Sequence, residues 1–397
     1  MEKILVINSG SSTVKFKLYL MPAEKEIAKG LLERIGHENS QITIKYGDGQ
    51  VYKEETNLFN HSVAIKKILE LLKSLNIVKD FNEIAGVGHR VVAGGEYFKK
   101  SVIVDDDVIA KIDEIADFAP LHNPNNLIGI KEFKKLLPNT ISVAAFDTAF
   151  HQTNPEENYM YSTPYEWYKD YGARRYGYHG ISHQYVSQMA AEYLNKPLKD
   201  LKMITCHLGA GASLCAIKDG KSFDTSMGFT PLAGLTMATR AGDVDFSLVA
   251  YIMNKKHITD VNEALDILNK KSGLLGISGL SSDSRDLEKA EKEGNKRAAL
   301  ANELFVKNVV RYIGQYYAEM RGLDSIVFTA GIGENSVMIR KRIIERLAFM
   351  GIELDDQKNE AQEIIISKPT SKISVLRVPT NEELMIARDV EKLKNNK

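Results

Sequence analysis

The sequence predicts an α/β protein made of two similar halves. Short apolar runs typical of strands, such as residues 141–146, alternate with stretches that carry a helical stripe of apolar residues, such as residues 62–75 and 296–321. A strand–turn–strand pattern occurs near the start of the chain and again near its middle. The length of 397 residues suits two or three domains of ordinary size.

The repeated pattern indicates where the two halves lie. Residues 4–8 and 14–20 read as two strands joined by a turn rich in serine, and residues 203–207 and 213–217 read as two strands joined by Gly-Ala-Gly. Self-similarity of this kind is the signature of a duplicated unit. We therefore expect a domain boundary near residues 148–152, after a further strand.

The composition excludes several classes of protein. Lys plus Arg and Asp plus Glu both number 52, so the zero net charge gives no bulk attraction to nucleic acid or to an anionic membrane. Cys206 and Cys215 are too few for a disulfide framework or a four-cysteine zinc site, which favours a reducing, cytoplasmic setting. No run reaches the roughly 18 apolar residues of a membrane span, and residues 1–8 are expected to form a buried strand rather than a signal peptide.

Three turns of small residues follow strand-like runs and are candidates for binding phosphate: residues 8–15, 207–213 and 329–335. Glycine lets backbone N–H groups approach an anion closely, and Lys15 adds a positive charge beside the first turn. The first turn is not a Walker A loop, because that pattern is absent and a strand follows. The third lies between a strand and a helix, where helix-terminal N–H groups bind anions. Each turn taken alone is also compatible with an ordinary loop.

Charged residues at the ends of apolar runs form a second group of candidates. Arg90 lies beside an apolar run and before Gly94 and Gly95, Asp147 follows a buried strand, and Arg240 lies among small residues. Two arginines and a carboxylate in glycine-rich segments suit an anionic reacting group. A structural ion pair between Asp147 and either arginine is the alternative.

His179 and His183 have the i, i+4 spacing of a metal-binding pair. We reject a zinc site, because Gly180 interrupts the helix that would align the two rings and no H-E-x-x-H motif is present. Ser182 has the character of an N-cap. His179 is then expected to lie just outside a helix N-terminus and to act alone.

Residues 380–383 contain the T-x-x-E pattern of a capping box. In that motif Glu383 would accept a hydrogen bond from the backbone N–H of Thr380. Glu382 would remain free at the start of the helix, either to reach a metal ion or as an ordinary solvated acid.

Taken together, these segments resemble the acetate kinase family. The likeness is collinear over nearly the whole chain and is carried by residues 7–12, 88–92, 119–124, 146–151, 175–180, 224–228, 331–335 and 380–383. The resemblance implies two duplicated actin-like (ribonuclease H-like) domains with a nucleotide-binding cleft between them. It places them at residues 1–150 and 151–380, with a C-terminal helix at 381–397 completing the first domain.

The resemblance also implies Mg²⁺-dependent transfer of phosphate from ATP to acetate, giving acetyl phosphate and ADP, with Mn²⁺ as a possible substitute. It implies a cytoplasmic homodimer that binds neither nucleic acid nor membrane. Departures from the family pattern at Ala93, Ala210 and Tyr178 bear on substrate preference. The alternatives are a propionate kinase of the same family and, in a different class, a non-catalytic actin-like nucleotide-binding module.

The matching positions imply a role for each residue. Metal binding falls to Asn8 and Glu382, acetate binding to Arg90, and transition-state stabilisation to His179 and Arg240, with Asp147 the essential carboxylate. The apolar pocket for the acetate methyl consists of Val92, Leu121, Tyr178 and Pro231. The nucleotide-binding positions are Ser11, Ser12, Lys15, His207, Leu208, Gly209, Ala210, Gly211, Asp283, Ser284, Arg285, Gly331, Ile332, Gly333, Glu334 and Asn335.

Acetate is already ionised at neutral pH, so its attack needs no base. We therefore expect direct in-line transfer, helped mostly by positioning and charge neutralisation. In this interpretation Asp147 orients other groups and does not abstract a proton.

Overall fold

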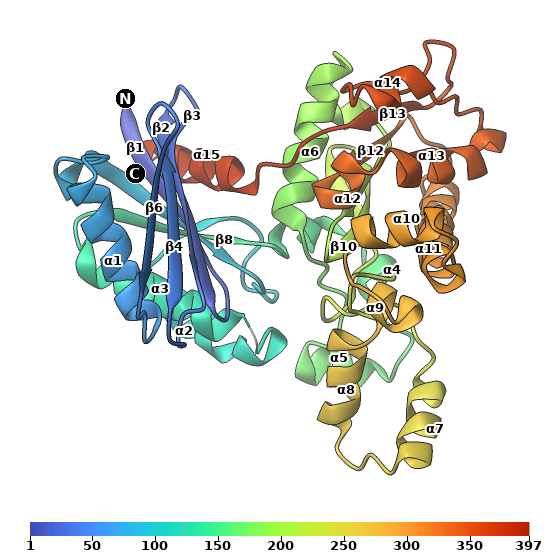
Figure 1. Cartoon of the computed structure of the whole chain (residues 1–397), viewed down its shortest axis with the longest axis horizontal. Helices are drawn as coiled ribbons and strands as arrows, with labels where there is room; N and C mark the ends of the chain where they lie inside the picture. Colours follow the sequence, from blue (N-terminus) through green and yellow to red (C-terminus); the bar gives the residue numbers. More distant parts are fainter. Residues whose placement is uncertain (121, 397) are drawn as a thin grey trace. The chain divides into compact units, whose positions relative to one another are not determined.

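The structure is a computed structural model that describes residues 1–120 and 122–396. The chain divides into two compact units, Met1–Phe150 with Asn381–Lys397 and His151–Thr380, which we call the first and second units. Each unit contains one β-sheet flanked by helices (Figure 1). The prediction of the α/β class is confirmed.

The first unit is built on an eight-stranded sheet with the order β5-β4-β3-β2-β1-β6-β8-β7. Its strands are β1 (Glu2–Ser9), β2 (Thr13–Met21), β3 (Lys25–Glu33), β4 (Ser40–Tyr46), β5 (Gln50–Thr56), β6 (Ile84–Val91), β7 (Val102–Ile103) and β8 (Ile141–Phe146). Its α-helices are α1 (His61–Ser74), α2 (Asp106–Glu114), α3 (Asn123–Leu136) and α15 (Glu382–Asn395). Strand β1 pairs antiparallel with β2 and parallel with β6, which in turn pairs parallel with β8.

Helices cover both faces of the central strands of this sheet. On one face, Leu5, Ile7 and Phe16 pack with apolar residues of α1 and α3 in a continuous core. The other face is covered by α15, which lies beside β1, β6 and β8 (Figure 1). Gly86 and Gly88 of β6 allow the close approach of this helix, because a Cβ atom at either position would lie 2.4 Å from a side-chain carbon of α15.

The second unit is built on a five-stranded sheet with the order β11-β10-β9-β12-β13. Its strands are β9 (Met203–Leu208), β10 (Ala212–Lys218), β11 (Lys221–Thr225), β12 (Ser325–Thr329) and β13 (Ser374–Arg377). Its α-helices are α4 (Glu156–Tyr159), α5 (Tyr165–Tyr171), α6 (Gly180–Tyr193), α7 (Phe246–Lys256), α8 (Val261–Lys270), α9 (Gly273–Ser278), α10 (Ser284–Lys292), α11 (Lys296–Met320), α12 (Ala330–Asn335), α13 (Val337–Arg346) and α14 (Asp356–Glu360). Every residue of β9 and β12 is buried, as expected for strands covered on both faces.

Five strands have the same order and directions in the two units. The series β3-β2-β1-β6-β8 matches β11-β10-β9-β12-β13, with two antiparallel pairings followed by two parallel ones. Each unit also contains one helix that comes after a strand of the other unit in the sequence. Helix α6 follows β8 of the first unit in sequence but packs on β9 and β12, whereas α15 follows β13 of the second unit but packs on the first sheet.

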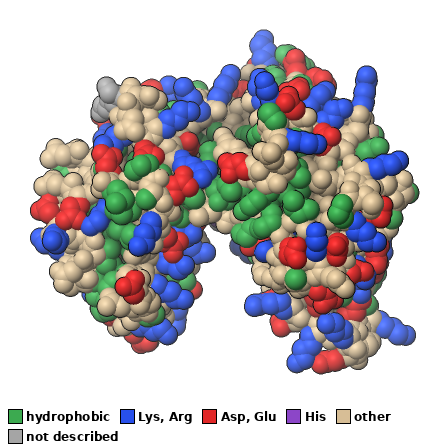
Figure 2. Space-filling model, turned by 90° about the horizontal axis from the view of Figure 1, so that it is seen from above, with side chains coloured by type: hydrophobic (Ala, Val, Ile, Leu, Met, Phe, Trp, Pro, Cys, Tyr) green, Lys and Arg blue, Asp and Glu red, His purple; other side chains and the backbone are tan. Residues whose placement is uncertain are grey.

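The surface agrees with the balanced composition. Basic and acidic side chains are interspersed over the visible face of each unit (Figure 2). Among the residues that the structure describes, none of the helices has both the length and the apolar character of a membrane span.

Candidate active site

Three of the candidate residues lie at the carboxyl ends of neighbouring strands in the first unit. Asn8 is near the end of β1, Arg90 is near the end of β6, and Asp147 directly follows β8. The three strands run parallel, so their carboxyl ends meet at one edge of the sheet. Alternate residues of a strand share a face, so Arg90 lies on the same face as Gly86 and Gly88, under α15.

Arg90 connects this group. Its Nε and Nη2 atoms donate to the two carboxylate oxygens of Asp147 at 3.0 and 2.5 Å, and Nη1 donates to Asn8 Oδ1 at 3.4 Å. Asp147 is almost completely buried. Burial disfavours the charged guanidinium, but Asp147 and Glu382 more than compensate and raise the pKa of Arg90. The structure therefore contains the ion pair that the sequence left open.

Glu382 is the first residue of α15 and lies 3.8 Å from Arg90 Nε. The predicted capping box is wrong. Asn381 is the N-cap and accepts from Leu384 N, while Glu383 forms an ion pair with Lys17 at 3.2 Å. The carboxylate of Glu383 thus bonds to Lys17, far away in the sequence, and not to the backbone of Thr380 as in a capping box. Glu382 remains outside the cap, as the sequence analysis expected.

The electrostatics of Glu382 suit a cation. Burial and the nearby carboxylates of Asp147 and Glu383 raise its pKa to about 7, although Arg90 and Lys15 act in the opposite direction. Within the described residues, no group of three or more His, Cys, Asp and Glu side chains is arranged to hold a metal. Magnesium usually takes only one or two carboxylates and fills its other positions with water and substrate phosphates. The oxygen donors of Asn8 and Glu382 therefore fit that ion.

The first phosphate-loop candidate is the tight turn between β1 and β2. Its backbone closes through a 2.8 Å hydrogen bond from Gly10 N to Thr13 O. Val14 and Phe16 point into the core, so Lys15 lies on the opposite face of the strand and is exposed. This face also holds Lys17 and is the one that α15 packs against.

Two asparagines of α3, neither of them a predicted site residue, bond to the backbone at the ends of β1 and β6. Asn126 donates to Ser9 O at 2.7 Å and accepts from Val92 N at 3.2 Å. Asn123 both accepts from Ala93 N and donates to Ala93 O at 3.0 Å. Asparagines that are buried in the first turns of a helix, where water cannot satisfy the amide, are the signal that could have revealed them.

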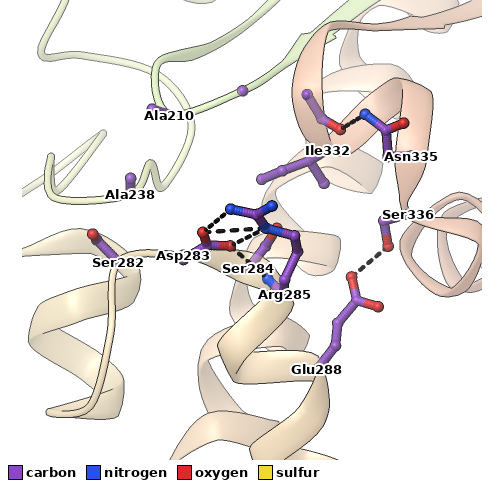
Figure 3. Close-up of a pocket in the computed structure, with 12 residues that line it drawn as sticks. Ala210, Ala238, Ser282, Asp283, Ser284, Arg285, Glu288, Ile332, Asn335 and Ser336 are labelled. Atoms are coloured by element: carbon purple, nitrogen blue, oxygen red, sulfur yellow. Dashed lines mark hydrogen bonds and ion pairs between the residues drawn. The ribbon is translucent and has the colours of Figure 1, made fainter.

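The second unit contains a cavity of about 660 Å³, a volume typical of small-molecule sites (Figure 3). It brings together parts of three segments that the sequence identified as nucleotide-binding. The residues that line it are Gly209, Ala210, Ala238, Ser282, Asp283, Ser284, Arg285, Glu288, Gly331, Ile332, Asn335 and Ser336. Ala238, Ser282, Glu288 and Ser336 were not predicted as nucleotide-binding residues.

Polar contacts order the walls of this cavity. Arg285 donates to both carboxylate oxygens of Asp283, with Nη2 at 2.6 Å from Oδ2, and Asn335 Nδ2 donates to Gly331 O at 2.8 Å (Figure 3). Ser336 Oγ donates to Glu288 Oε1 at 2.6 Å. The first two contacts order the segments in which they lie, and the contact of Ser336 with Glu288 connects two separate segments of the cavity wall.

Two of the predicted nucleotide-binding residues also make contacts within the fold. The carboxylate of Glu334 accepts from the backbone N–H groups of Ala330 and Thr380, so it caps the short helix α12. A Cβ atom at Gly333 would lie 3.4–3.7 Å from Phe328, Cys206 and Leu208, which is ordinary van der Waals contact, so this glycine lies against the sheet. Residues 331–335 lie between β12 and α13, as expected, but they form the short helix α12 and not a turn.

His179 and Arg240 meet over the glycine turn between β9 and β10. A Cβ atom built on Gly211 would lie 3.2 Å from His179 Nε2 and 3.6 Å from Arg240 Nη1. Arg240 donates to Pro231 O at 3.2 Å, and burial lowers its pKa. The rings of His179 and His207 stack with their centroids 4.1 Å apart.

The N-terminus of α6 differs in part from the prediction. His179 precedes the helix, as expected, and adopts a left-handed conformation with φ of 58°. The helix begins at Gly180, so the expectation of an N-cap at Ser182 is wrong. Ser182 instead lies within the helix, 2.8 Å from His207 Nδ1, and His183 is buried against the sheet.

The residues predicted to form the acetate-methyl pocket belong to both units. Val92 is buried in the first unit, and Leu121 lies outside the described residues. In the second unit the Tyr178 hydroxyl donates to Phe229 O at 2.7 Å, and Pro231 accepts from Arg240. The hydroxyl of Tyr178, a departure from the family pattern, therefore bonds to the backbone.

Comparison with known proteins supplies the family. The model of the acetokinase family matches residues 3–388. Acetate kinase of Fructilactobacillus sanfranciscensis is 58% identical over 397 residues and covers 100% of both chains. The chain belongs to the acetokinase family. Membership in this family makes it a phosphotransferase that acts on a carboxyl group.

Solved structures agree with the acetokinase assignment. The crystal structure of Porphyromonas gingivalis acetate kinase has a TM-score of 0.95 and 44% identity, covering 99% of this chain and 100% of that one. A propionate kinase from Francisella tularensis has a TM-score of 0.94 and 40% identity with the same coverage. Acetate and propionate kinases thus share this acetokinase fold.

Proposed function

We propose that this chain is an acetate kinase that transfers the γ-phosphoryl group of ATP reversibly to acetate, directly and in line. Family membership and the high identity to acetate kinases support the reaction. The observation within the site that carries the proposal is the two-point ion pair between Arg90 and Asp147 at the ends of β6 and β8. This pair fixes a guanidinium beside Asn8 and Glu382, where a carboxylate substrate and a phosphate need positive charge.

The pair also assigns a role to Asp147. Both of its oxygens accept from Arg90, and the side chain is buried, so its geometry is that of a group that orients an arginine. Acetate is ionised at neutral pH and has no proton to lose. We infer that Arg90 binds the substrate carboxylate and that Asp147 acts as a positioning group.

The remaining residues supply nucleotide binding and positive charge. The cavity lined by Asp283, Arg285 and Asn335 has the size for an adenosine moiety. Lys15, His179 and Arg240 would neutralise the charge that develops on the transferring phosphoryl group. Arginines in this role are worth about 10³–10⁵ in rate.

Asn8 and Glu382 would hold the magnesium ion, in part through water, in the first unit. A bound magnesium ion supplies positive charge to the phosphate oxygens. Mn²⁺ accepts the same oxygen ligands. The raised pKa of Glu382 follows from burial and from carboxylates crowded together, an arrangement that a divalent cation relieves.

A coupled assay with MgATP and a series of short carboxylates tests this proposal. We expect acetate to give the highest kcat/KM and propionate a lower but measurable value. A preference for propionate would favour the function named for the Francisella structure. ATP binding without turnover of any carboxylate would favour a non-catalytic nucleotide-binding module and contradict the proposal.

We also propose that the chain forms a homodimer through the exposed surface of α7 and α8. Helix α7 buries none of its residues, although Phe246, Leu248 and Tyr251 are apolar and are 77%, 52% and 57% exposed. Exposed apolar patches of this kind mark interaction sites. Val261 and Leu265 of α8 extend the apolar surface.

Light scattering coupled to size-exclusion chromatography tests the dimer. We expect a mass near twice 44.4 kDa for the wild-type chain and near 44.4 kDa for Leu248→Glu. Val51→Glu is the matched control, because Val51 is also 52% exposed but lies in the first unit. A monomeric wild type, or a Leu248→Glu variant that stays dimeric, would contradict this surface.

The two cysteines are consistent with a reducing, cytoplasmic setting. Cys215 pairs with Thr205 across the strands and Cys206 pairs with Leu214, so the two thiols point to opposite faces of the sheet. Burial raises the pKa of both thiols, which keeps them protonated and unreactive.

A further inference from the structure

A chain of hydrogen bonds runs behind His179 through the interior of the second unit. His179 Nδ1 lies 2.8 Å from Ser213 Oγ, which lies 2.8 Å from His183 Nε2. His183 Nδ1 lies 2.7 Å from Thr205 Oγ1, and Thr205 Oγ1 lies 3.5 Å from the backbone oxygen of Cys215. His183, Thr205 and Ser213 are completely buried.

The chemistry of these groups sets the direction of the hydrogen bonds. A carbonyl oxygen only accepts, so Thr205 donates its proton to Cys215 O and must accept from His183 Nδ1–H. A neutral His183 then has a lone pair on Nε2 and accepts from the Ser213 hydroxyl. Ser213 has no second proton to give, so it accepts from His179 Nδ1–H. With His183 neutral, this is the assignment that provides one donor and one acceptor for all four contacts.

His183 stays neutral because of where it lies. Its ring is buried between α6 and the sheet, and burial lowers its pKa well below the usual value for histidine. The nearby rings of His151 and His207 lower it further. A doubly protonated His183 would donate from both nitrogens. The hydrogen bonds would then no longer run in one direction from His179 to Cys215 O.

We propose that Thr205, His183 and Ser213 are positioning residues that hold neutral His179 as the tautomer with its proton on Nδ1. Nε2, the nitrogen nearest Gly211 and Arg240, then carries a lone pair and becomes a donor only when the ring gains a second proton. This inference deepens the proposed function and rests on it, because it assigns the imidazolium form of His179 to the stabilisation of the phosphoryl group. The neutral ring would present a lone pair to that anion.

Three ionisable groups of the second unit surround the His179 ring. Arg240 approaches the same point above Gly211, His207 stacks on the ring, and the His183 ring lies 6.5 Å away on the next turn of α6. The Nδ1 of His207 contacts Ser182 Oγ, so His207 belongs to a separate hydrogen-bond pair. The chain through Ser213 is therefore the path that sets the tautomer of His179.

Nitrogen-15 NMR of the full chain, labelled at histidine, measures the tautomer directly and needs no substrate. The His179 signals are identified by their loss in His179→Gln. In the wild-type protein, at a pH where His179 is neutral, we expect a protonated Nδ1 and an unprotonated Nε2. Exposed histidines ordinarily prefer the opposite tautomer, so the result is distinctive.

Two variants should reverse this tautomer. Ser213→Ala removes the acceptor of His179 Nδ1–H. Thr205→Val leaves every direct contact of His179 intact but deprives His183 Nδ1–H of its acceptor. His183 should then move its proton to Nε2, donate to Ser213 and turn the Ser213 hydroxyl toward His179 Nδ1, because a buried N–H without an acceptor is costly. Both variants should therefore show His179 protonated on Nε2.

Ser187→Ala is the matched control, because Ser187 is buried in α6 but bonds only to Gln184 O among the contacts of the described residues. It should keep the wild-type tautomer. In the acetate kinase assay, Ser213→Ala should lower kcat about 10-fold, the value of one hydrogen bond, with little change in the KM for ATP. Ser187→Ala should have normal kinetics.

A wild-type His179 protonated on Nε2 would overturn the inference, as would an unchanged tautomer in both Thr205→Val and Ser213→Ala. A tautomer as expected in a protein that phosphorylates no carboxylate would instead contradict the proposed function and leave the positioning chain in place. The two failures are therefore distinguishable.

Discussion

The same five-strand arrangement carries opposite chemistry at its strand ends in the two units. In the first unit, the carboxyl ends of β1, β6 and β8 hold a network of full charges centred on Arg90 and Asp147. In the second unit, the corresponding end of β9 carries a glycine turn and buried histidines in neutral hydrogen bonds. A duplicated fold thus has two equivalent sheet edges, at the carboxyl ends of the strands, and each can carry its own set of functional side chains.

Helices α15 and α6 show this difference most clearly. Glu382 opens α15 and His179 immediately precedes α6, so each helix begins with a candidate residue beside the strand ends. Glu382 is placed among charges, whereas His179 is held through neutral hydroxyl and imidazole groups. Loss of a side chain from the first site should therefore leave a buried charge without a partner. Loss of a side chain from the second site should not.

The largest effects are expected from Arg90→Ala and Arg240→Ala. Each should lower kcat for acetate by at least about 10³-fold, because each removes a charge-assisted contact to the reacting groups. Near-normal kinetics in either variant would contradict the role assigned to that arginine. Steady-state assays with MgATP and acetate provide the measurement.

The two variants should differ in stability, which sharpens the comparison. Arg90→Ala leaves Asp147 buried without a partner and should reduce the free energy of unfolding of the first unit by about 3 kcal/mol or more. Arg240→Ala removes a buried cation whose contacts are a carbonyl and a thioether, so stability should change little. Arg388→Ala is the control, because it breaks another arginine–carboxylate pair of the first unit, that with Glu24. Denaturant unfolding followed by hydrogen exchange would separate the units.

A smaller loss is expected from Asp147→Asn, by about 10²–10³ in kcat, as for loss of one orienting contact in a charged site. The loss should be similar at every pH from about 6 to 8, because acetate needs no base. A wild-type rate that follows the titration of one carboxylate in this range, and that loses this dependence in the variant, would support a general base instead.

Much of the fold was predictable because its signals are local. Residues 4–8 and 203–207 are apolar runs that lead into polar turns, and both form buried strands followed by antiparallel partners. The errors lie where a distant partner decides. Glu383 pairs with Lys17 and not with the adjacent backbone, and Ser182 lies within α6 against His207 and is not an N-cap.

The site was predictable where it depends on strand ends. Arg90 lies beside an apolar run and Asp147 follows one, and parallel pairing of those strands brings the two residues together. Asn126 and Thr205 were missed because their importance lies in contacts with residues far away in the sequence. The local periodicity of apolar residues in a single sequence does not reveal these pairings.

A moderate effect on specificity is expected from Val92→Ala. If Val92 limits the pocket for the acetate methyl, its truncation should improve propionate relative to acetate by about 10- to 200-fold, the usual value of one methylene. ATP affinity should not change, because the cavity lined by Asp283 and Asn335 lies in the other unit. An unchanged ratio of kcat/KM for the two acids would refute the assignment of Val92.

The smallest effect concerns acid stability and uses one buried histidine from each unit. Burial lowers the pKa of His89 to about 3 and that of His151 to about 4, from an ordinary value near 6.5. Between pH 6.5 and these values the unfolded chain binds a proton that the folded chain does not, so stability is full above about pH 6.5 and falls on acidification, by about 1.4 kcal/mol per pH unit for each histidine. Native-state hydrogen exchange at pH 7, 6 and 5 measures this decrease in stability strand by strand. His89→Gln should reduce the decrease for β1 and β6 alone. His151→Gln should reduce it for β9 and β10 alone. An equal reduction in both units by either variant would show that the two units unfold together, and no reduction would show that these histidines are protonated in the folded state.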